Sequence, residues 1–425
     1  MNPINIYYRI FQQFFRPISA LLQWREPQLL IGEDAISKLP EAIKAQGLER
    51  VFVVVDKTLE DLGLAKELYK SLENGGIAYE IYNKTQPNPT IDNVELGRQL
   101  YIKSKAQGLI AFGGGSQIDC AKGIRLRIAW PGKTIQQLKS SVRNNLHGLF
   151  FPHKLKIVPL FAIPTTAGSG SEGTVAAVIS DARTHEKYPV NDVRFIPEWA
   201  VLEPSITAGL PPAITASTGL DALTHAVEAF IGQANTKATK EHAKKSVKLV
   251  FENLYTAYND GKNLTARENM LLASYYGGLA FTRAFVGYSH AIAHVLGGLY
   301  GTPHGLANAV ILPHVLEWYG KSVHKSLAIL ADEAGIDAGL STNAEKAQAF
   351  IQAIKKLCHD MEIPEKLDMV QQEDIPRIVK TALKEANPLY PVPKIMHKRS
   401  CEAFLRSIIV SQSSVEEKTR TAVGV

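Results

Sequence analysis

A carboxylate and four histidines, arranged in pairs with helical spacing, restrict what this chain can fold into more than any other feature. Asp221 and His225 are four residues apart, so on a helix they lie one turn apart on the same face. His290 and His294 repeat this spacing, and His304 follows in a turn rich in glycine and proline. Such oxygen and nitrogen ligands on separate elements can converge on one divalent ion, and they suit zinc or ferrous iron better than calcium or magnesium.

A single histidine on a helix is more often a hydrogen-bonded core residue than a metal ligand. Two pairs at helical spacing, together with a histidine in a turn, favour a metal site instead. The spacing alone leaves open whether His290 or His294 binds the ion.

The part of the chain that carries these residues is predicted to be rich in helices. Within residues 206–425, the apolar residues recur with helical periodicity in several stretches. These stretches are 239–259, 264–284, 304–319, 343–359 and 375–385. We therefore expect a helical C-terminal domain.

Residues 28–205 follow a different pattern. Short apolar runs such as Val51–Val55 and Leu109–Phe112 alternate with helical stretches such as Ala35–Gln46 and Ile91–Lys105. This alternation predicts a mostly parallel sheet with helices on its faces. A chain of 425 residues is also long enough for two domains.

Two of the predicted strands end in residues that suit a nucleotide. Asp56 follows Val51–Val55 and can accept hydrogen bonds from a ribose, although an aspartate there can also cap the next helix. Leu109–Phe112 runs into Gly113–Ser116, where consecutive glycines at a helix start let backbone amides approach a phosphate. A tight turn would need fewer glycines, so the sequence favours phosphate binding.

A third loop of the same kind follows the predicted strand Ile157–Ile163. It carries the hydroxyl groups of Thr165, Thr166 and Ser169. Loops at the carboxyl ends of parallel strands commonly bind ligands. We expect these hydroxyls to hold ribose, phosphate or the nicotinamide amide.

Residues 1–27 are predicted to be an aromatic, amphipathic N-terminal extension. Tyr7, Phe11, Phe14 and Phe15 share one helical stripe, and Pro17 is expected to end or kink the helix. We favour a helix that docks on its own domain or on a second subunit. A helix that lies on a membrane surface is the alternative, but two arginines provide only weak electrostatic attraction to anionic lipids.

Composition argues against nucleic-acid-binding and transmembrane proteins. The net charge of +6 comes from basic residues interleaved with acids, and no apolar run approaches the ~20 residues that a membrane span needs. The three cysteines, Cys120, Cys358 and Cys401, fit neither a disulfide framework nor a zinc ribbon. They favour a reducing, cytoplasmic location.

Four segments carry a resemblance to a known family. In sequence order they are GGGSQIDCAKG, PTTAGSGSE, TGLDALTHAVEAF and HAIAHVLGGLYGTPHGLANA. Their order and spacing resemble the iron-containing (group III) alcohol dehydrogenase family over roughly residues 28 to 400. The resemblance implies an N-terminal dinucleotide-binding α/β domain, followed by an all-α C-terminal metal-binding domain.

The resemblance also implies roles for the residues of the metal site. It implies Asp221, His225, His290 and His304 as the ligands, and His294 as a catalytic residue that handles a proton. The implied ion is Fe²⁺, although these ligands also accept Zn²⁺ or another divalent ion.

For the cofactor, the resemblance places Asp56 at the adenosine ribose, which favours NAD over NADP because a carboxylate repels a 2′-phosphate. The other implied cofactor-binding residues are Asn88, Gly114, Gly115, Ser116, Thr165, Thr166, Ser169 and Lys187.

The function implied is an NAD-dependent, metal-dependent alcohol dehydrogenase or aldehyde reductase that acts on a small alcohol or diol, as a homodimer or larger homo-oligomer. Three alternatives stay open at this point. They are a sister lyase or synthase on the same scaffold, a metal-dependent hydrolase, and a scaffold protein that works through its N-terminal helix.

Overall fold

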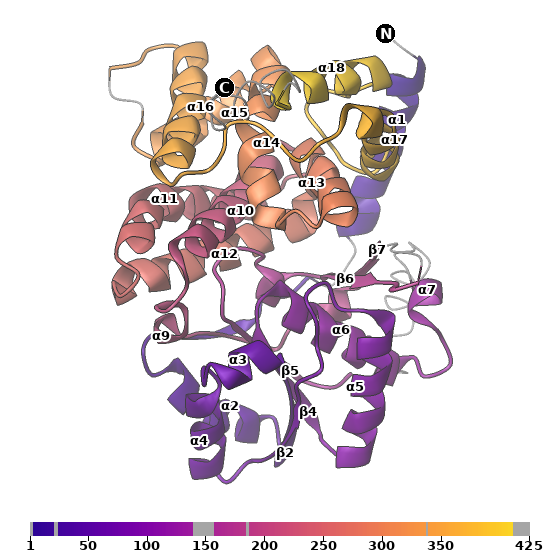
Figure 1. The fold of residues 1–425 in the computed structure, drawn as a ribbon, viewed down its shortest axis with the longest axis vertical. Helices are drawn as coiled ribbons and strands as arrows, with labels where there is room; N and C mark the ends of the chain where they lie inside the picture. The colour runs from indigo at the N-terminus through magenta and orange to yellow at the C-terminus, as the bar shows by residue number, and fades with distance from the viewer. Residues whose placement is uncertain (1–2, 21–23, 139–156, 184–186, 337–338, 411–425) are drawn as a thin grey trace, which may run out of the picture.

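The computed structural model describes residues 3–20, 24–138, 157–183, 187–336 and 339–410. A parallel sheet with its covering helices occupies the lower half of Figure 1, and a helical part occupies the upper half. This arrangement confirms the predicted fold class, a mostly parallel α/β part followed by a helical part.

The main sheet has six parallel strands in the order β1-β8-β5-β4-β2-β3. Two further strands, β6 and β7, pair antiparallel in a separate hairpin. The strands are β1 Gln28–Ile31, β2 Arg50–Val54, β3 Ala78–Tyr82, β4 Gly108–Gly113, β5 Leu160–Pro164, β6 Ala176–Ser180, β7 Lys187–Asn191 and β8 Trp199–Leu202.

Helices cover both faces of this sheet, because successive side chains of a buried strand point to opposite faces. In β2, Val51 and Val53 join the core beneath α2 and α4, whereas Phe52 and Val54 join the core beneath α5 and α6. The helices of this half are α2 Ala35–Ala45, α3 Lys57–Asp61, α4 Lys66–Asn74, α5 Ile91–Ser104, α6 Gly115–Ala129 and α7 Ile135–Leu138.

The carboxyl ends of three neighbouring strands, β5, β4 and β2, lie side by side at one edge of the sheet. Asp56 follows β2, the loop of Gly113–Ser116 follows β4, and Thr165–Ser169 follows β5. The three segments predicted to contact a nucleotide are therefore neighbours in space.

Sequence patterns missed part of this half. The hairpin of β6 and β7 and the strand β8 were not expected, and the strand predicted at 157–163 is observed as Leu160–Pro164. These short segments alternate weakly, so they depend on pairing with distant strands more than on their own pattern.

The helical part follows β8 and has one large apolar core. The observed Leu264–Ala284 and His304–Tyr319 agree with the predicted helices to the residue. Its helices are α9 Pro204–Thr207, α10 Pro212–Ile231, α11 Lys237–Asn259, α12 Leu264–Ala284, α13 Tyr288–Tyr300, α14 His304–Tyr319, α15 His324–Glu333, α16 Asn343–Asp360, α17 Ile375–Ala386 and α18 Lys398–Ile408. Short 3-10 turns are Ser171–Gly173, Val193–Phe195, Gly320–Ser322 and Gln372–Asp374.

The N-terminal helix α1, Pro3–Ala20, docks on the helical part through polar side chains. Arg9 donates hydrogen bonds to the carbonyls of Val392 and Pro393, and Gln12 donates to those of Pro388 and Tyr390. The docking agrees with the favoured interpretation that the helix packs on its own chain.

Of the two outcomes expected at Pro17, an end of the helix is not observed, because α1 continues to Ala20. A proline removes one helical N–H donor, and the remaining bonds of α1 still carry the helix past it. Among the described residues, no helix combines the length and apolar character needed to cross a membrane.

Candidate metal centre and cofactor loops

Helix α10 supplies two of the four predicted metal ligands. It starts with Pro212 in its first turn, where a proline needs no hydrogen-bond partner for a missing N–H, and it runs unbroken to Ile231. Asp221 and His225 lie one turn apart on its buried face, and both are about 5% exposed.

The other two ligand candidates stand at the starts of α13 and α14. His290 lies in the first turn of α13, and His304 is the first residue of α14 rather than part of a free turn. A Cβ atom at Gly305 would lie 2.3 Å from the carbonyl oxygen of Ser217. Glycine at 305 therefore lets α14 begin directly against α10, which brings His304 to Asp221.

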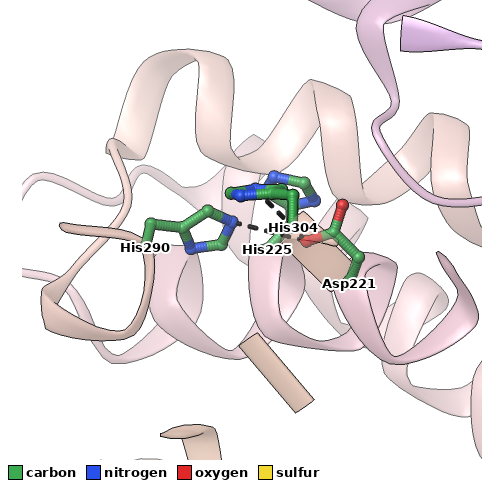
Figure 2. Close-up of side chains that lie close together, drawn as sticks. All are labelled: Asp221, His225, His290 and His304. Carbon is green, nitrogen blue, oxygen red and sulfur yellow. Dashed lines mark ion pairs between the residues drawn. The ribbon is translucent and has the colours of Figure 1, made fainter. Parts of the chain in front are cut away.

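The four side chains converge, as Figure 2 shows. One ligand atom from each of Asp221, His225, His290 and His304 lies within 4.8 Å of the others. The Oδ1 atom of Asp221 is 3.8 Å from Nε2 of His290 and 3.6 Å from Nε2 of His304. These separations are too long for direct hydrogen bonds and leave a central position that all four can reach.

The chemistry of the donors fits a divalent cation. Burial lowers the pKa of His225 and His290 and lowers that of His304 to about 4. Burial alone would raise the pKa of Asp221, but the neighbouring histidines outweigh it and lower the pKa to about 2. At neutral pH the group therefore offers one carboxylate and neutral imidazoles, the states that metal ligands need. The Nε2 atom of His290 is buried without a hydrogen-bond partner.

Asn308 is a neighbour of this group that sequence analysis missed. It is fully buried, and its Nδ2 atom donates to Oδ1 of Asp221 at 2.7 Å. It lies one turn after His304 on α14, so the i, i+4 spacing could have identified it.

His294 lies beside the group of four and is held by a different carboxylate. Its Nδ1 atom is 2.7 Å from Oε1 of Glu385, which also accepts a hydrogen bond from the Tyr390 hydroxyl. The His294 ring stacks on His304 with centroids 5.1 Å apart. Burial alone would lower the pKa of His294, but the Glu385 carboxylate raises it above the ordinary value. Glu385 is 91 residues away in the sequence, and no local pattern indicated it.

The two glycine-rich loops of the α/β part, which follow β4 and β5, face each other. A Cβ atom at Gly114 would lie 3.2 Å from Oγ1 of Thr166, and one at Gly115 would lie 3.1 Å from Oγ of Ser169. The glycines therefore leave a narrow cradle between the two loops. Thr165 is buried and anchors its loop by donating its backbone N–H to the Gly113 carbonyl.

Three further predicted cofactor residues form a chain of hydrogen bonds. The backbone N–H of Asn88 donates to Oγ of Ser116, and Nζ of Lys187 donates to Oδ1 of Asn88 at 3.1 Å. The Lys187 ammonium also lies near α13, 3.6 Å from the position of a Cβ atom at Gly297. Burial lowers the pKa of Lys187.

Asp56 connects the end of β2 to helix α6. Its Oδ1 atom accepts the backbone N–H of Leu59 as the N-cap of α3, and its Oδ2 atom accepts Nε2 of Gln117 at 2.8 Å. The capping alternative raised for Asp56 is thus observed. Each oxygen keeps a second lone pair for another donor.

Lys122 ties helix α6 to the loop that follows β5. It is fully buried, and its three N–H groups are shared among five oxygens within hydrogen-bond distance, the carbonyls of Ser171, Thr174 and Ala176 and the hydroxyls of Ser171 and Thr174. Asp119 in turn accepts the Ser171 hydroxyl at 2.7 Å. Lys122 therefore fixes this segment to α6.

The loop after β5 also reaches the helical part. A Cβ atom at Gly168 would lie 2.7 Å from Cβ of Thr218 on α10, and one at Gly170 would lie 2.7 Å from Cα of Gly278 on α12. Thr218 is three residues before Asp221. The loop after β5 is therefore packed closely against α10, which carries Asp221 and His225, and against α12.

Comparison with known proteins covers both halves of the chain. Residues 27–204 match the family described as iron-containing alcohol dehydrogenase, and residues 215–409 match the C-terminal part of the Fe-containing alcohol dehydrogenase family. Alcohol dehydrogenase 4 of Schizosaccharomyces pombe is 36% identical over 368 residues, which cover 85% of this chain and 84% of that protein.

Solved structures agree with this match. A 1,3-propanediol oxidoreductase has a TM-score of 0.84 and 32% identity, covering 91% of this chain and 99% of that one. Sulfoacetaldehyde reductase from Bifidobacterium kashiwanohense, in complex with NAD+, has a TM-score of 0.79 and 26% identity, covering 91% of this chain and 98% of that one. The lyase and hydrolase alternatives are not favoured. The chain belongs to the iron-containing alcohol dehydrogenase family, and the protein is an alcohol/aldehyde oxidoreductase.

Proposed function

We propose that the protein transfers a hydride between NAD and a small alcohol or diol, at a divalent metal ion held by Asp221, His225, His290 and His304. The observation that carries the proposal is the convergence of these four side chains beside loops that suit a dinucleotide. The solved relative with bound NAD+ supports the choice of cofactor.

The metal role is supported by the donor set and by the unpartnered, buried Nε2 atom of His290. A bound divalent ion acts as a Lewis acid, which acidifies an alcohol hydroxyl and polarises an aldehyde carbonyl. We propose Fe²⁺ as the ion because of the family, although the same ligands accept Zn²⁺.

The cofactor role rests on the cradle between the two glycine-rich loops. Gly114, Gly115 and Ser116 present the N-terminus of α6 to the pyrophosphate, where free amides and the helix dipole favour an anion. Asp56 accepts hydrogen bonds from the adenosine ribose. The other proposed contacts along the cofactor are Asn88, Thr165, Thr166, Ser169 and Lys187.

His294 is proposed to hold and move the proton of the reaction. Its contact with Glu385 favours the protonated imidazole, and its stacking on His304 places it next to the proposed ligands. In alcohol oxidation a neutral His294 takes up the proton, and in aldehyde reduction a protonated His294 returns it.

Several broader proposals accompany this function. We propose an N-terminal extension over 1–27, a dinucleotide-binding domain over 28–205 and a catalytic metal-binding domain over 206–425. We also propose a cytoplasmic homodimer or larger homo-oligomer, for which the separate, buried and unpaired cysteines and the family resemblance are the support.

Nicotinamide absorbance tests the proposal on protein loaded with Fe²⁺ in the absence of oxygen. NADH and NADPH are compared with a panel of short aldehydes. We expect NADH oxidation, its loss in His290→Ala, and a gain of NADPH use in Asp56→Gly. The matched control is His314→Ala, because His314 contacts the Glu365 carbonyl and is not among the four. Failure to bind NADH would contradict the proposal.

A further inference from the structure

Glu228 is a buried carboxylate that the proposed chemistry does not use. It lies on α10 on the same face as Asp221 and His225, and it is 3% exposed. Its Oε2 atom accepts the backbone N–H of Gly287 and contacts Nδ1 of His290, each at 2.7 Å. Its Oε1 atom accepts the backbone N–H of Ser289 at 2.8 Å.

These contacts make Glu228 the cap of α13. The helix starts after Gly287, which has no side chain with which to cap it. A carboxylate at a helix N-terminus satisfies free amides and favours the positive end of the dipole. Glu228 thus fixes the first turn of α13, which carries His290, to the helix that carries Asp221.

The same carboxylate determines which nitrogen of His290 carries a proton. An ionised carboxylate can only accept a hydrogen bond, so Nδ1 of His290 must be the N–H donor. The opposite nitrogen, Nε2, is then bare, and it points toward Asp221 with no other partner. A bare ring nitrogen is the form that binds a metal.

Gly287 leaves room for this carboxylate because it has no side chain. A Cβ atom at residue 287 would lie 2.6 Å from Oε1 and 2.9 Å from Cδ of Glu228. A side chain at this position would therefore displace the carboxylate from His290 without altering any charge.

We propose that Glu228 is the positioning residue of the metal centre, because it holds His290 in the tautomer and orientation that bind the ion. This inference rests on the proposed metal role of Asp221, His225, His290 and His304. A glutamine at 228 would have one oxygen and one NH₂ group in place of two acceptor oxygens, so it could not accept from Gly287, Ser289 and Nδ1 of His290 at the same time.

The structure offers a matched control on the same helix. His294, one turn after His290, makes an equivalent contact of 2.7 Å between its Nδ1 atom and Glu385. His294 is not among the four converging residues. Removing the carboxylate of Glu385 therefore perturbs a histidine–carboxylate pair without touching a proposed ligand.

The test measures the Zn²⁺ dissociation constant by chelator competition, and the visible absorption of the Co²⁺-loaded protein, in four proteins. They are the wild type, Glu228→Gln, Gly287→Ala and Glu385→Gln. We expect weakening by roughly 10- to 100-fold and an altered Co²⁺ spectrum in Glu228→Gln and Gly287→Ala. Glu385→Gln is expected to keep both properties of the wild type.

An unchanged Zn²⁺ affinity and Co²⁺ spectrum in folded Glu228→Gln would overturn the inference. Glu228 would then only cap α13, and its replacement would lower the unfolding midpoint without affecting the metal site. If Glu228→Gln does not fold, Gly287→Ala decides by the same criteria. A wild type that binds neither ion would instead contradict the proposed function.

Discussion

At the scale of single residues, much of the site depends on side chains that hold other side chains. Gln117 illustrates this, because its amide fixes one oxygen of Asp56 while the backbone of Leu59 fixes the other. The carboxylate is thereby held between α3 and the first turn of α6. In the proposed role of Asp56 at the ribose, this held negative charge would repel a 2′-phosphate.

We therefore expect Gln117→Ala to raise the KM for NADH by about fivefold, which corresponds to the loss of about 1 kcal/mol from one hydrogen bond. The kcat should be unchanged, because Gln117 contacts no reacting group. Steady-state kinetics with NADH checks this, with Gln137→Ala, an exposed glutamine of α7, as the control. An unchanged KM would show that Asp56 needs no support.

Glu385 sets the protonation of His294 in the same manner. Its carboxylate raises the pKa of His294 against the effect of burial. In Glu385→Gln the pKa of His294 should fall, because the carboxylate that raises it is gone. Alcohol oxidation needs the neutral imidazole, so the pH at which its kcat/KM rises should be lower in the variant. Aldehyde reduction needs the protonated imidazole, so the pH at which its kcat/KM declines should also be lower. Profiles of kcat/KM against pH in both directions measure this, and unshifted profiles would disprove it.

At the scale of elements, one buried ammonium holds a helix to a loop. Lys122 on α6 contacts carbonyl and hydroxyl oxygens of residues 171–176, and those of Ser171 and Thr174 are buried with it. The start of α6 and the loop after β5 therefore move as one unit. Both line the cradle between the glycine-rich loops.

Replacing this ammonium by an apolar group would leave buried acceptors without a donor. Lys122→Met should lower the free energy of unfolding by roughly 3–5 kcal/mol. Urea unfolding measures the change, and Lys103→Met, at an exposed position of α5, should stay within about 0.5 kcal/mol of the wild type. Comparable losses in the two variants would argue against a special role for Lys122.

Elements with strong local signals were predictable, and those formed by distant pairing were not. Helix Leu264–Ala284 shows helical periodicity in its own sequence and was predicted to the residue. The strand Trp199–Leu202 has little pattern of its own and depends on β1 and β5 for its partners. The same difference holds within the site. The spacing of Asp221, His225 and the later histidines predicted that such residues could converge on one ion. The contact of Glu385 with His294 joins residues far apart in the chain, and neither segment has a sequence pattern that indicates it.

At the scale of the molecule, the candidate metal centre joins three helices, α10, α13 and α14. An ion bound there would add a further link between segments that are already joined by packing and by the hydrogen bonds of Glu228 and Asn308. Such an ion stabilises the folded state by about 2.7 kcal/mol when its free concentration is 100 times its dissociation constant.

The pH dependence of this effect follows from the ligands. The pKa of His304 is lowered to about 4 and those of His225 and His290 are also lowered, so near neutral pH no proton needs to leave. The Zn²⁺ affinity should therefore be almost constant between about pH 6 and 8. A site made of three exposed histidines would instead bind Zn²⁺ roughly 60-fold more weakly at pH 6 than at pH 8. Chelator competition at both pH values measures this, and a steep loss at pH 6 would contradict it.

Gly170 and Gly278 bring two backbones together at the junction of the halves, with no side chain between them. A contact between two glycines leaves no room for sliding and no side chain to rearrange. The loop after β5 is thereby seated directly on α12, and the contact of Gly168 with Thr218 seats the same loop on α10. A bulky residue at either glycine would have to separate the two backbones, so it would lift this loop, and with it one side of the cradle, away from the helix that supports it.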